Sequence, residues 1–101
     1  MKPGAAPPRV DGRRAIRCVV AGRVQGVYYR AATAERATAL GIGGWVKNLP
    51  DGRGEVVADG PLEALTEFAA WLWQGPPAAR VASVQVDEWT EAVADRFDVR
   101  G

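Results

Sequence analysis

The sequence predicts an α+β fold in which two helices cover one face of an antiparallel sheet. Short segments in which apolar and polar residues alternate are separated by two longer segments whose apolar residues recur every three or four positions. Glycine and proline clusters stand between these segments, which gives the order β-α-β-β-α-β with a short strand at the end. This order is typical of a split β-α-β sandwich, with one layer of helices on one sheet.

The first strand is predicted over residues 15–21, "AIRCVVA". Ile16, Cys18 and Val20 point to one side and alternate with residues of the other side, which is the pattern of a half-buried strand. Cys18 therefore belongs to the predicted core, and no residue near it in the sequence would activate its thiol. As the only cysteine of the chain, it cannot form an internal disulfide.

The first helix is predicted over residues 29–40, because an apolar stripe there is followed by Gly41, which favours a helix end. The stripe consists of Tyr29, Thr33, Ala37 and Leu40. Two further strands, residues 42–48 and 54–59, flank "LPDGR", whose Pro-Asp-Gly order is typical of a turn. We therefore expect these two strands to form a hairpin.

The second helix is predicted to begin at Pro61, because the first helical position tolerates proline, and to end at "GPP", residues 75–77. Its apolar stripe consists of Leu65, Phe68, Ala69 and Leu72. Trp71 and Trp73 lie off this stripe. We expect these two tryptophans to pack partly under a loop rather than to form a binding platform.

Two more strands are predicted after the second helix. "VASVQVDEW", which begins at residue 81, alternates, and its inward residues are expected to be Ala82, Val84 and Val86. Phe97 and Val99 mark a short final strand. No internal repeat and no linker to a second domain is visible in the sequence, so one sheet with one helical layer is expected.

Composition indicates a single small domain, since 48% of the 101 residues are hydrophobic and 25% are charged. Residues 1–14 carry four basic side chains, one acidic side chain and three prolines, which predicts a mobile N-terminal extension before a domain at residues 15–101. The rest of the chain is slightly acidic, which disfavours broad nucleic-acid binding. With no long apolar run and no signal-peptide pattern, we expect a cytoplasmic protein, and its small size without an obvious apolar patch favours a monomer.

The segment "VVAGRVQGVYYR", residues 19–30, leads from the first predicted strand into the first predicted helix. Gly22 and Gly26 permit a left-handed backbone or a close approach, and the helix start offers unpaired backbone N–H groups. Arg30 adds a guanidinium that can hold two phosphate oxygens, so the loop is predicted to bind a phosphoryl group. The segment matches neither a P-loop nor a dinucleotide-binding motif, and a tight turn would explain the two glycines alone equally well.

The predicted topology brings Asn48 to the same loop. Because a helix connects the first two strands, these strands run parallel and end at the same edge of the sheet, where Asn48 lies. The alternative interpretation is a turn asparagine before "LPDG". The chain has no histidine and one cysteine, so the usual zinc ligands are missing and we expect neither a metal nor another cofactor.

Four motifs, "GRVQGVYYR", "LGIGGWVKNLPDG", "EVVADG" and "GPPAARV", together resemble the acylphosphatase family, and the resemblance extends to the final "FDV". It implies a ferredoxin-like fold and hydrolysis of the carboxyl-phosphate bond of acyl phosphates, with Arg30 and Asn48 as catalytic residues. By this resemblance, Arg30 binds the phosphate and Asn48 orients the attacking water. The residues implied in the phosphate-binding cradle are Gln25, Gly26, Val27, Tyr28, Tyr29 and Arg30. Gly54 stands where a β-branched residue is common in similar sequences.

Two other functions remain compatible with this fold class. A non-catalytic module that binds phosphate or an acyl phosphate would keep the loop but would not need Asn48, so this residue favours an enzyme. An RNA-recognition domain would carry an aromatic and basic motif on a central strand, and "EVVADG" has neither feature. The expected partners are a small acyl phosphate and inorganic phosphate, with no nucleic acid and no membrane.

Overall fold

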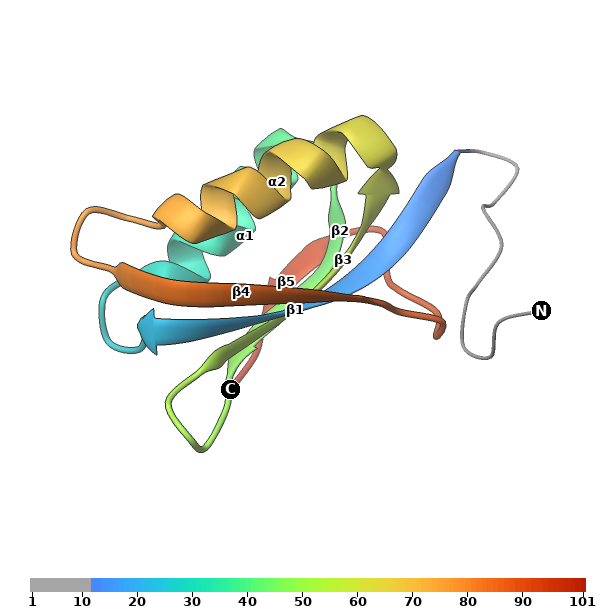
Figure 1. Cartoon of the computed structure of the whole chain (residues 1–101). Coiled ribbons are helices and arrows are strands. Elements are labelled where there is room, and N and C mark those ends of the chain that lie inside the picture. The colour runs from blue at the N-terminus through green and yellow to red at the C-terminus, as the bar shows by residue number, and fades with distance from the viewer. Residues whose placement is uncertain (1–11) are drawn as a thin grey trace.

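The computed structural model describes residues 12–101. The elements along the chain are β1 (Arg13–Arg23), α1 (Tyr29–Ala39), β2 (Gly43–Asn48), β3 (Gly54–Pro61), α2 (Leu62–Gln74), β4 (Arg80–Glu88) and β5 (Phe97–Val99). The strands form one five-stranded sheet in the order β4-β1-β3-β2-β5, and both helices cover the same face (Figure 1). The predicted α+β fold, with two helices on one face of the sheet, is confirmed. Neither helix of the described chain is long and apolar enough to span a membrane.

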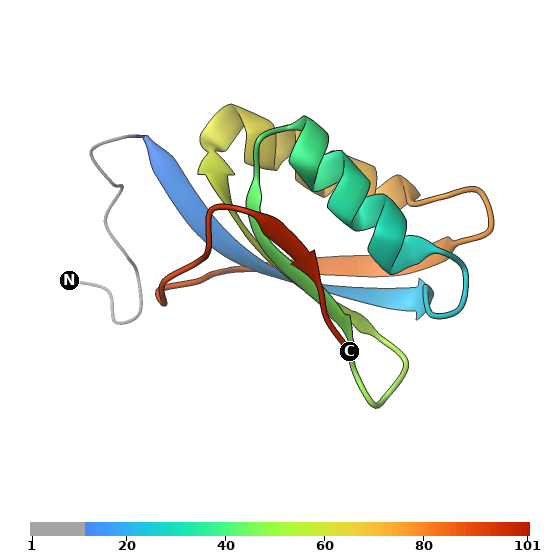
Figure 2. The same cartoon turned by 180° about the vertical axis from the view of Figure 1, so that it is seen from behind.

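The strand pairing places the ends of β1 and β2 at one edge of the sheet. Both strands pair antiparallel with β3, which lies between them, so they run parallel to each other as predicted. Gly54 of β3 pairs with Val20 on one side and Asn48 on the other. The sheet is mixed rather than purely antiparallel, because β5 pairs parallel with β2 and Val46 lies opposite Val99. Figure 2 shows β5 beside β2, with the C-terminus near the β2–β3 hairpin.

The hydrophobic core lies between the helices and the sheet. Both predicted helix stripes supply buried residues, namely Tyr29, Thr33, Ala37, Leu65, Phe68 and Leu72. Phe68 of α2 meets Phe97 of β5 edge to face, with ring centroids 6.0 Å apart. Cys18 is fully buried, and burial raises the pKa of its thiol from 9.0 to about 12. The thiol therefore stays protonated at neutral pH and behaves as a core side chain.

Strand β4 differs from the prediction. The prediction that Ala82 faces the core is wrong, because Ala82 is exposed, whereas Val86 lies opposite the buried Cys18 on the core face of the sheet. In the pairing with β1, Ser83 lies opposite Ala21 and Val81 opposite Gly22, so Ala82 is the extra residue of a β-bulge. The bulge shifts the alternation, and Val81 packs against the core together with Val84. Val86 lies on the edge strand of the sheet, where it has no neighbouring strand on one side and is 48% exposed.

The second helix also differs in detail. Pro61 is the last residue of β3 and the N-cap of α2 rather than its first helical residue, since its ψ of 147° is extended. The two tryptophans expected to pack partly under a loop differ in burial, since Trp71 is partly buried against the core and Trp73 is exposed. The Trp71 ring is tilted against the Tyr29 ring at a centroid distance of 5.9 Å, and Trp73 is 52% exposed.

Strand β1 begins earlier than predicted, inside the segment expected to be an extension. Arg13 belongs to β1, and its Nε lies 3.3 Å from Oδ1 of Asp59 on the neighbouring strand β3. The rest of the expected extension, residues 1–11, lies outside the described residues.

Gly22 and Gly26, on either side of the bend from β1 into the loop, should respond differently to alanine. Both have positive φ angles, 127° and 74°, but a Cβ at Gly22 would lie 2.1 Å from the Arg80 carbonyl oxygen, whereas one at Gly26 meets no atom within 4 Å. We expect Gly22→Ala to lower the free energy of unfolding by about 3 kcal/mol or more and Gly26→Ala by about 1 kcal/mol. Urea unfolding of the two variants checks this, and equal losses would contradict it.

Candidate functional site

A cavity of about 240 Å³ opens where the loop after β1, the start of α1 and the ends of β2 and β5 meet. Its lining residues are Val24, Gly26, Tyr28, Tyr29, Arg30, Ala31, Asn48 and Val99. The structure thus brings both expected catalytic residues, Arg30 and Asn48, to one cavity. Among the lining residues of the described chain, Arg30 alone carries a charge. The cavity therefore favours an anion.

The loop before α1 presents an uncapped helix N-terminus to this cavity. Gly26 and Tyr28 have left-handed backbones, with φ angles of 74° and 68°, and Tyr28 is the N-cap of α1. Within residues 12–101, no side chain caps this terminus by a hydrogen bond. The backbone N–H groups of the first turn consequently remain available to an anionic ligand, with the positive end of the helix dipole behind them.

Arg30 is held in place by the end of the chain beyond β5. Its Nη1 donates a hydrogen bond of 2.7 Å to the carbonyl oxygen of Arg100. Arg100 is itself fixed on β2, because its backbone N–H donates to the Val46 carbonyl at 2.8 Å and its guanidinium carbon lies 4.7 Å from the Trp45 ring centroid. A neutral carbonyl orients the guanidinium without cancelling its charge, and the other N–H groups of Arg30 remain for a phosphate.

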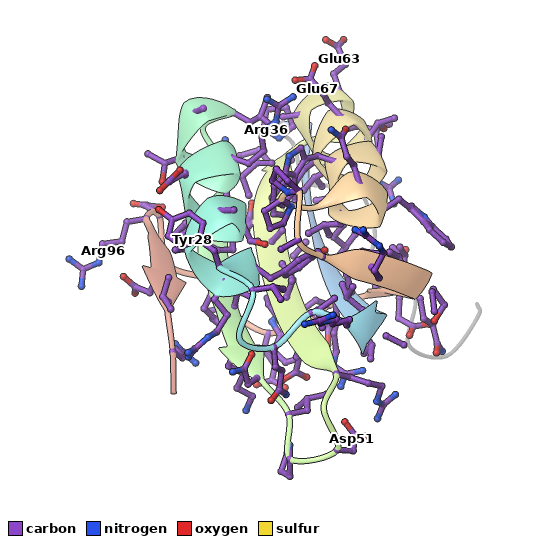
Figure 3. The ribbon with its side chains drawn as sticks, turned by 90° about the vertical axis from the view of Figure 1, so that its left-hand side faces the viewer. Tyr28, Arg36, Asp51, Glu63, Glu67 and Arg96 are labelled. Carbon is purple, nitrogen blue, oxygen red and sulfur yellow. The ribbon has the colours of Figure 1, made fainter. Side chains whose placement is uncertain are left out.

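Asn48 is the last residue of β2 and lines the cavity. Its carboxamide makes no hydrogen bond to any residue in the described part of the chain. The alternative interpretation as a turn asparagine is not supported by the hairpin, because other groups hold that turn. The Leu49 N–H donates to the Arg53 carbonyl at 2.8 Å, and the Arg53 N–H donates to the Asp51 carboxylate at 3.1 Å. Asp51 lies at the tip of the hairpin in Figure 3.

Three other residues of the expected cradle have structural side chains. Gln25 donates from Nε2 to the carbonyl oxygens of Leu49 and Arg53, at 2.8 and 3.2 Å, which ties the loop to the hairpin. Val27 packs against the core. Neither of these two residues lines the cavity. Tyr29 donates its buried hydroxyl to the Leu72 carbonyl at 2.6 Å and so joins the start of α1 to α2, and burial raises the pKa of Tyr29.

The sequence reasoning missed Val99 and Arg100 as parts of the site. The alternation at residues 97–99 predicts a short strand but does not show which strand it joins. Because β5 pairs parallel with β2, its end arrives beside the end of β2, where Val99 reaches the cavity and the Arg100 carbonyl reaches Arg30.

Fold and site together define a class: a two-layer α+β domain in which one arginine, one asparagine and an uncapped helix start share a cavity suited to an anion. The acylphosphatase family model matches residues 16–99 of the chain. The chain belongs to the acylphosphatase family, whose members are enzymes that hydrolyse acyl phosphates.

Individual relatives agree with this family assignment. The acylphosphatase of Cupriavidus metallidurans is 57% identical over 77 residues, which cover 76% of this chain and 81% of the relative. The structure of an acylphosphatase from Coxiella burnetii matches with a TM-score of 0.85 and 38% identity, covering 89% of this chain and 95% of that one. T. kodakarensis HypF contains a similar part, with a TM-score of 0.74 and 32% identity, covering 85% of this chain and 11% of that protein.

Proposed function

We propose that this enzyme cleaves its substrate by direct attack of water on phosphorus, with no covalent enzyme intermediate. Arg30 and the backbone N–H groups of the loop from Gln25 to Tyr29 hold the phosphoryl group, and Asn48 orients the water. The observation that carries the proposal is that Arg30, the uncapped start of α1 and Asn48, whose carboxamide has no hydrogen-bond partner within residues 12–101, all line one cavity. In such a site, catalysis consists of positioning and charge stabilisation.

The chemistry of the leaving group explains why the reaction needs no general acid. An acyl phosphate releases a carboxylate, whose conjugate acid has a pKa of about 4, so it departs at neutral pH without receiving a proton. No general acid is required. The chain contains no histidine, and among residues 12–101 the ionisable side chains that line the cavity are those of Arg30 and two tyrosines.

The side chains around the cavity favour water as the nucleophile. Cys18 belongs to the buried core, does not line the cavity and has a raised pKa. The hydroxyls of the two tyrosines that line the cavity already donate hydrogen bonds, Tyr29 to the Leu72 carbonyl and Tyr28 to the Glu35 carboxylate. The bond to Glu35 raises the pKa of Tyr28 and burial raises the pKa of Tyr29, so both phenols stay protonated at neutral pH and are poor nucleophiles for phosphorus. Asn48 can accept a hydrogen bond from a water molecule with its carbonyl oxygen and so aim the water's lone pair at phosphorus.

Hydrolysis of benzoyl phosphate by the purified chain, followed with and without a chelator, tests this function. Arginine keeps its charge and asparagine does not titrate, so we expect turnover to be flat between about pH 6 and 8 and unchanged by the chelator. Loss of activity in the chelator would overturn the mechanism. Phosphate binding without any turnover would instead identify a non-catalytic binding module.

A further inference from the structure

Two large apolar side chains on the cavity are left exposed to solvent. Tyr28 is 62% exposed and Val99 is 48% exposed, and both line the cavity that holds Arg30 and Asn48. Tyr28 comes from the start of α1 and Val99 from the end of β5, so they belong to different elements. Figure 3 shows Tyr28 at the start of α1, on the side of this helix nearer β5. When an apolar part of a ligand covers exposed apolar side chains at a polar cavity, the burial of both surfaces contributes favourable binding free energy.

Tyr28 is held in an unfavourable backbone conformation. With a φ of 68° and a ψ of 14°, it is the one non-glycine residue with positive φ in the described chain. Glycine or asparagine would adopt this conformation at lower cost than an aromatic residue. The side chain is not needed as a helix cap either, because it makes no capping hydrogen bond. Residues with a strained backbone of this kind are found mainly at functional sites.

The Tyr28 ring is also fixed in direction. Its hydroxyl donates a hydrogen bond to a carboxylate oxygen of Glu35, two turns along α1, so the exposed ring lies against the helix instead of moving freely. This bond raises the pKa of Tyr28 and keeps the phenol neutral at physiological pH. A ring that is already oriented loses little conformational entropy when a ligand covers it.

We infer that the ring of Tyr28, together with Val99, forms the subsite for the acyl group, and that the enzyme prefers acyl phosphates with an apolar, uncharged acyl group. This inference rests on the function proposed above, which places the phosphoryl end at Arg30 and the loop amides. The phosphoryl end then occupies the polar part of the cavity, and the acyl group extends over Tyr28 and Val99. An aromatic acyl group gains binding free energy by covering these side chains, whereas an acetyl group is too small to cover the ring.

The test compares benzoyl phosphate with acetyl phosphate as substrates. We expect Tyr28→Asn to lower the ratio of kcat/KM for benzoyl phosphate to that for acetyl phosphate by about five- to tenfold, mainly through KM for benzoyl phosphate. Asparagine accepts the left-handed backbone, so this variant should fold. Tyr28→Phe keeps the ring and should keep the ratio within about twofold of the parent. Because both variants retain the backbone N–H of residue 28, the ratio reports the side chain.

Trp73→Gln is the matched control, because Trp73 is an exposed aromatic residue that does not line the cavity. It should leave the ratio unchanged. Val99→Ser is a second variant that should lower the ratio in the same direction as Tyr28→Asn. A parent enzyme that hydrolyses both substrates while Tyr28→Asn and Val99→Ser retain the parental ratio would overturn the subsite alone. A parent that hydrolyses neither substrate would overturn the proposed function and the subsite with it.

Discussion

Arg30→Lys should lower kcat/KM for benzoyl phosphate by about a thousandfold. A guanidinium can donate to the Arg100 carbonyl and to two phosphate oxygens at once, whereas an ammonium is a single compact charge at the end of a flexible stem. A lysine at this position cannot donate to the Arg100 carbonyl and to two phosphate oxygens at the same time, so it would lose one of these interactions. Steady-state kinetics of the variant, with inorganic phosphate as a competitive inhibitor, measures both effects. We expect phosphate to inhibit the variant at least about tenfold more weakly.

Arg96→Lys is the matched control for this substitution. The Arg96 side chain is 85% exposed and pairs with Asp98 on β5, away from the cavity lining. Figure 3 shows its side chain pointing outward beside β5. This variant should keep parental kinetics, because the same chemical change occurs at a solvent-exposed site. Near-parental turnover of Arg30→Lys would show that the arginine does not hold the phosphoryl group as proposed.

Asn48→Ala should lower kcat by about a hundred- to a thousandfold while leaving phosphate inhibition nearly unchanged. In the proposed mechanism, Asn48 touches the attacking water, and Arg30 with the loop amides holds the phosphate. Removing the carboxamide therefore affects the reaction and not the binding of the product. The side chain makes no hydrogen bond within residues 12–101, so its loss should not lower the melting temperature measurably.

The two variants together separate the roles of the two residues. Arg30→Lys should lose phosphate affinity and turnover, and Asn48→Ala should lose turnover alone. A parallel loss of phosphate affinity and kcat in Asn48→Ala would indicate that the asparagine binds the phosphate directly. Full activity of that variant would remove it from the mechanism.

Local patterns in the sequence were sufficient to predict the elements of the fold and the meeting of Arg30 with Asn48. Alternation, apolar stripes and turn residues specify each element, and the parallel course of β1 and β2 follows from the helix that connects them. Asn48 reaches the loop because β1 and β2 both pair with β3, which is a consequence of element order.

Features that depend on contacts between distant segments could not be predicted in this way. The bulge at Ala82 is set by the close approach of Gly22 to β4, and no periodicity within residues 81–89 indicates it. The anchoring of Arg30 depends on a backbone carbonyl at Arg100, and every residue type offers such a carbonyl. The left-handed backbone of Tyr28 is likewise invisible in the sequence, since tyrosine is not a residue that favours it.

The central claim is a single displacement at phosphorus by water, and the stereochemical course of hydrolysis tests it most directly. The substrate is benzoyl thiophosphate, made chiral at phosphorus by oxygen-isotope labelling and hydrolysed by the enzyme in water of a different oxygen isotope. Direct in-line attack predicts inversion of configuration at phosphorus. Retention would contradict the account, because it requires a covalent phosphoenzyme formed and broken in two displacements. Solvent isotope in the benzoate instead of the thiophosphate would contradict it as well, because it indicates attack at the carbonyl carbon.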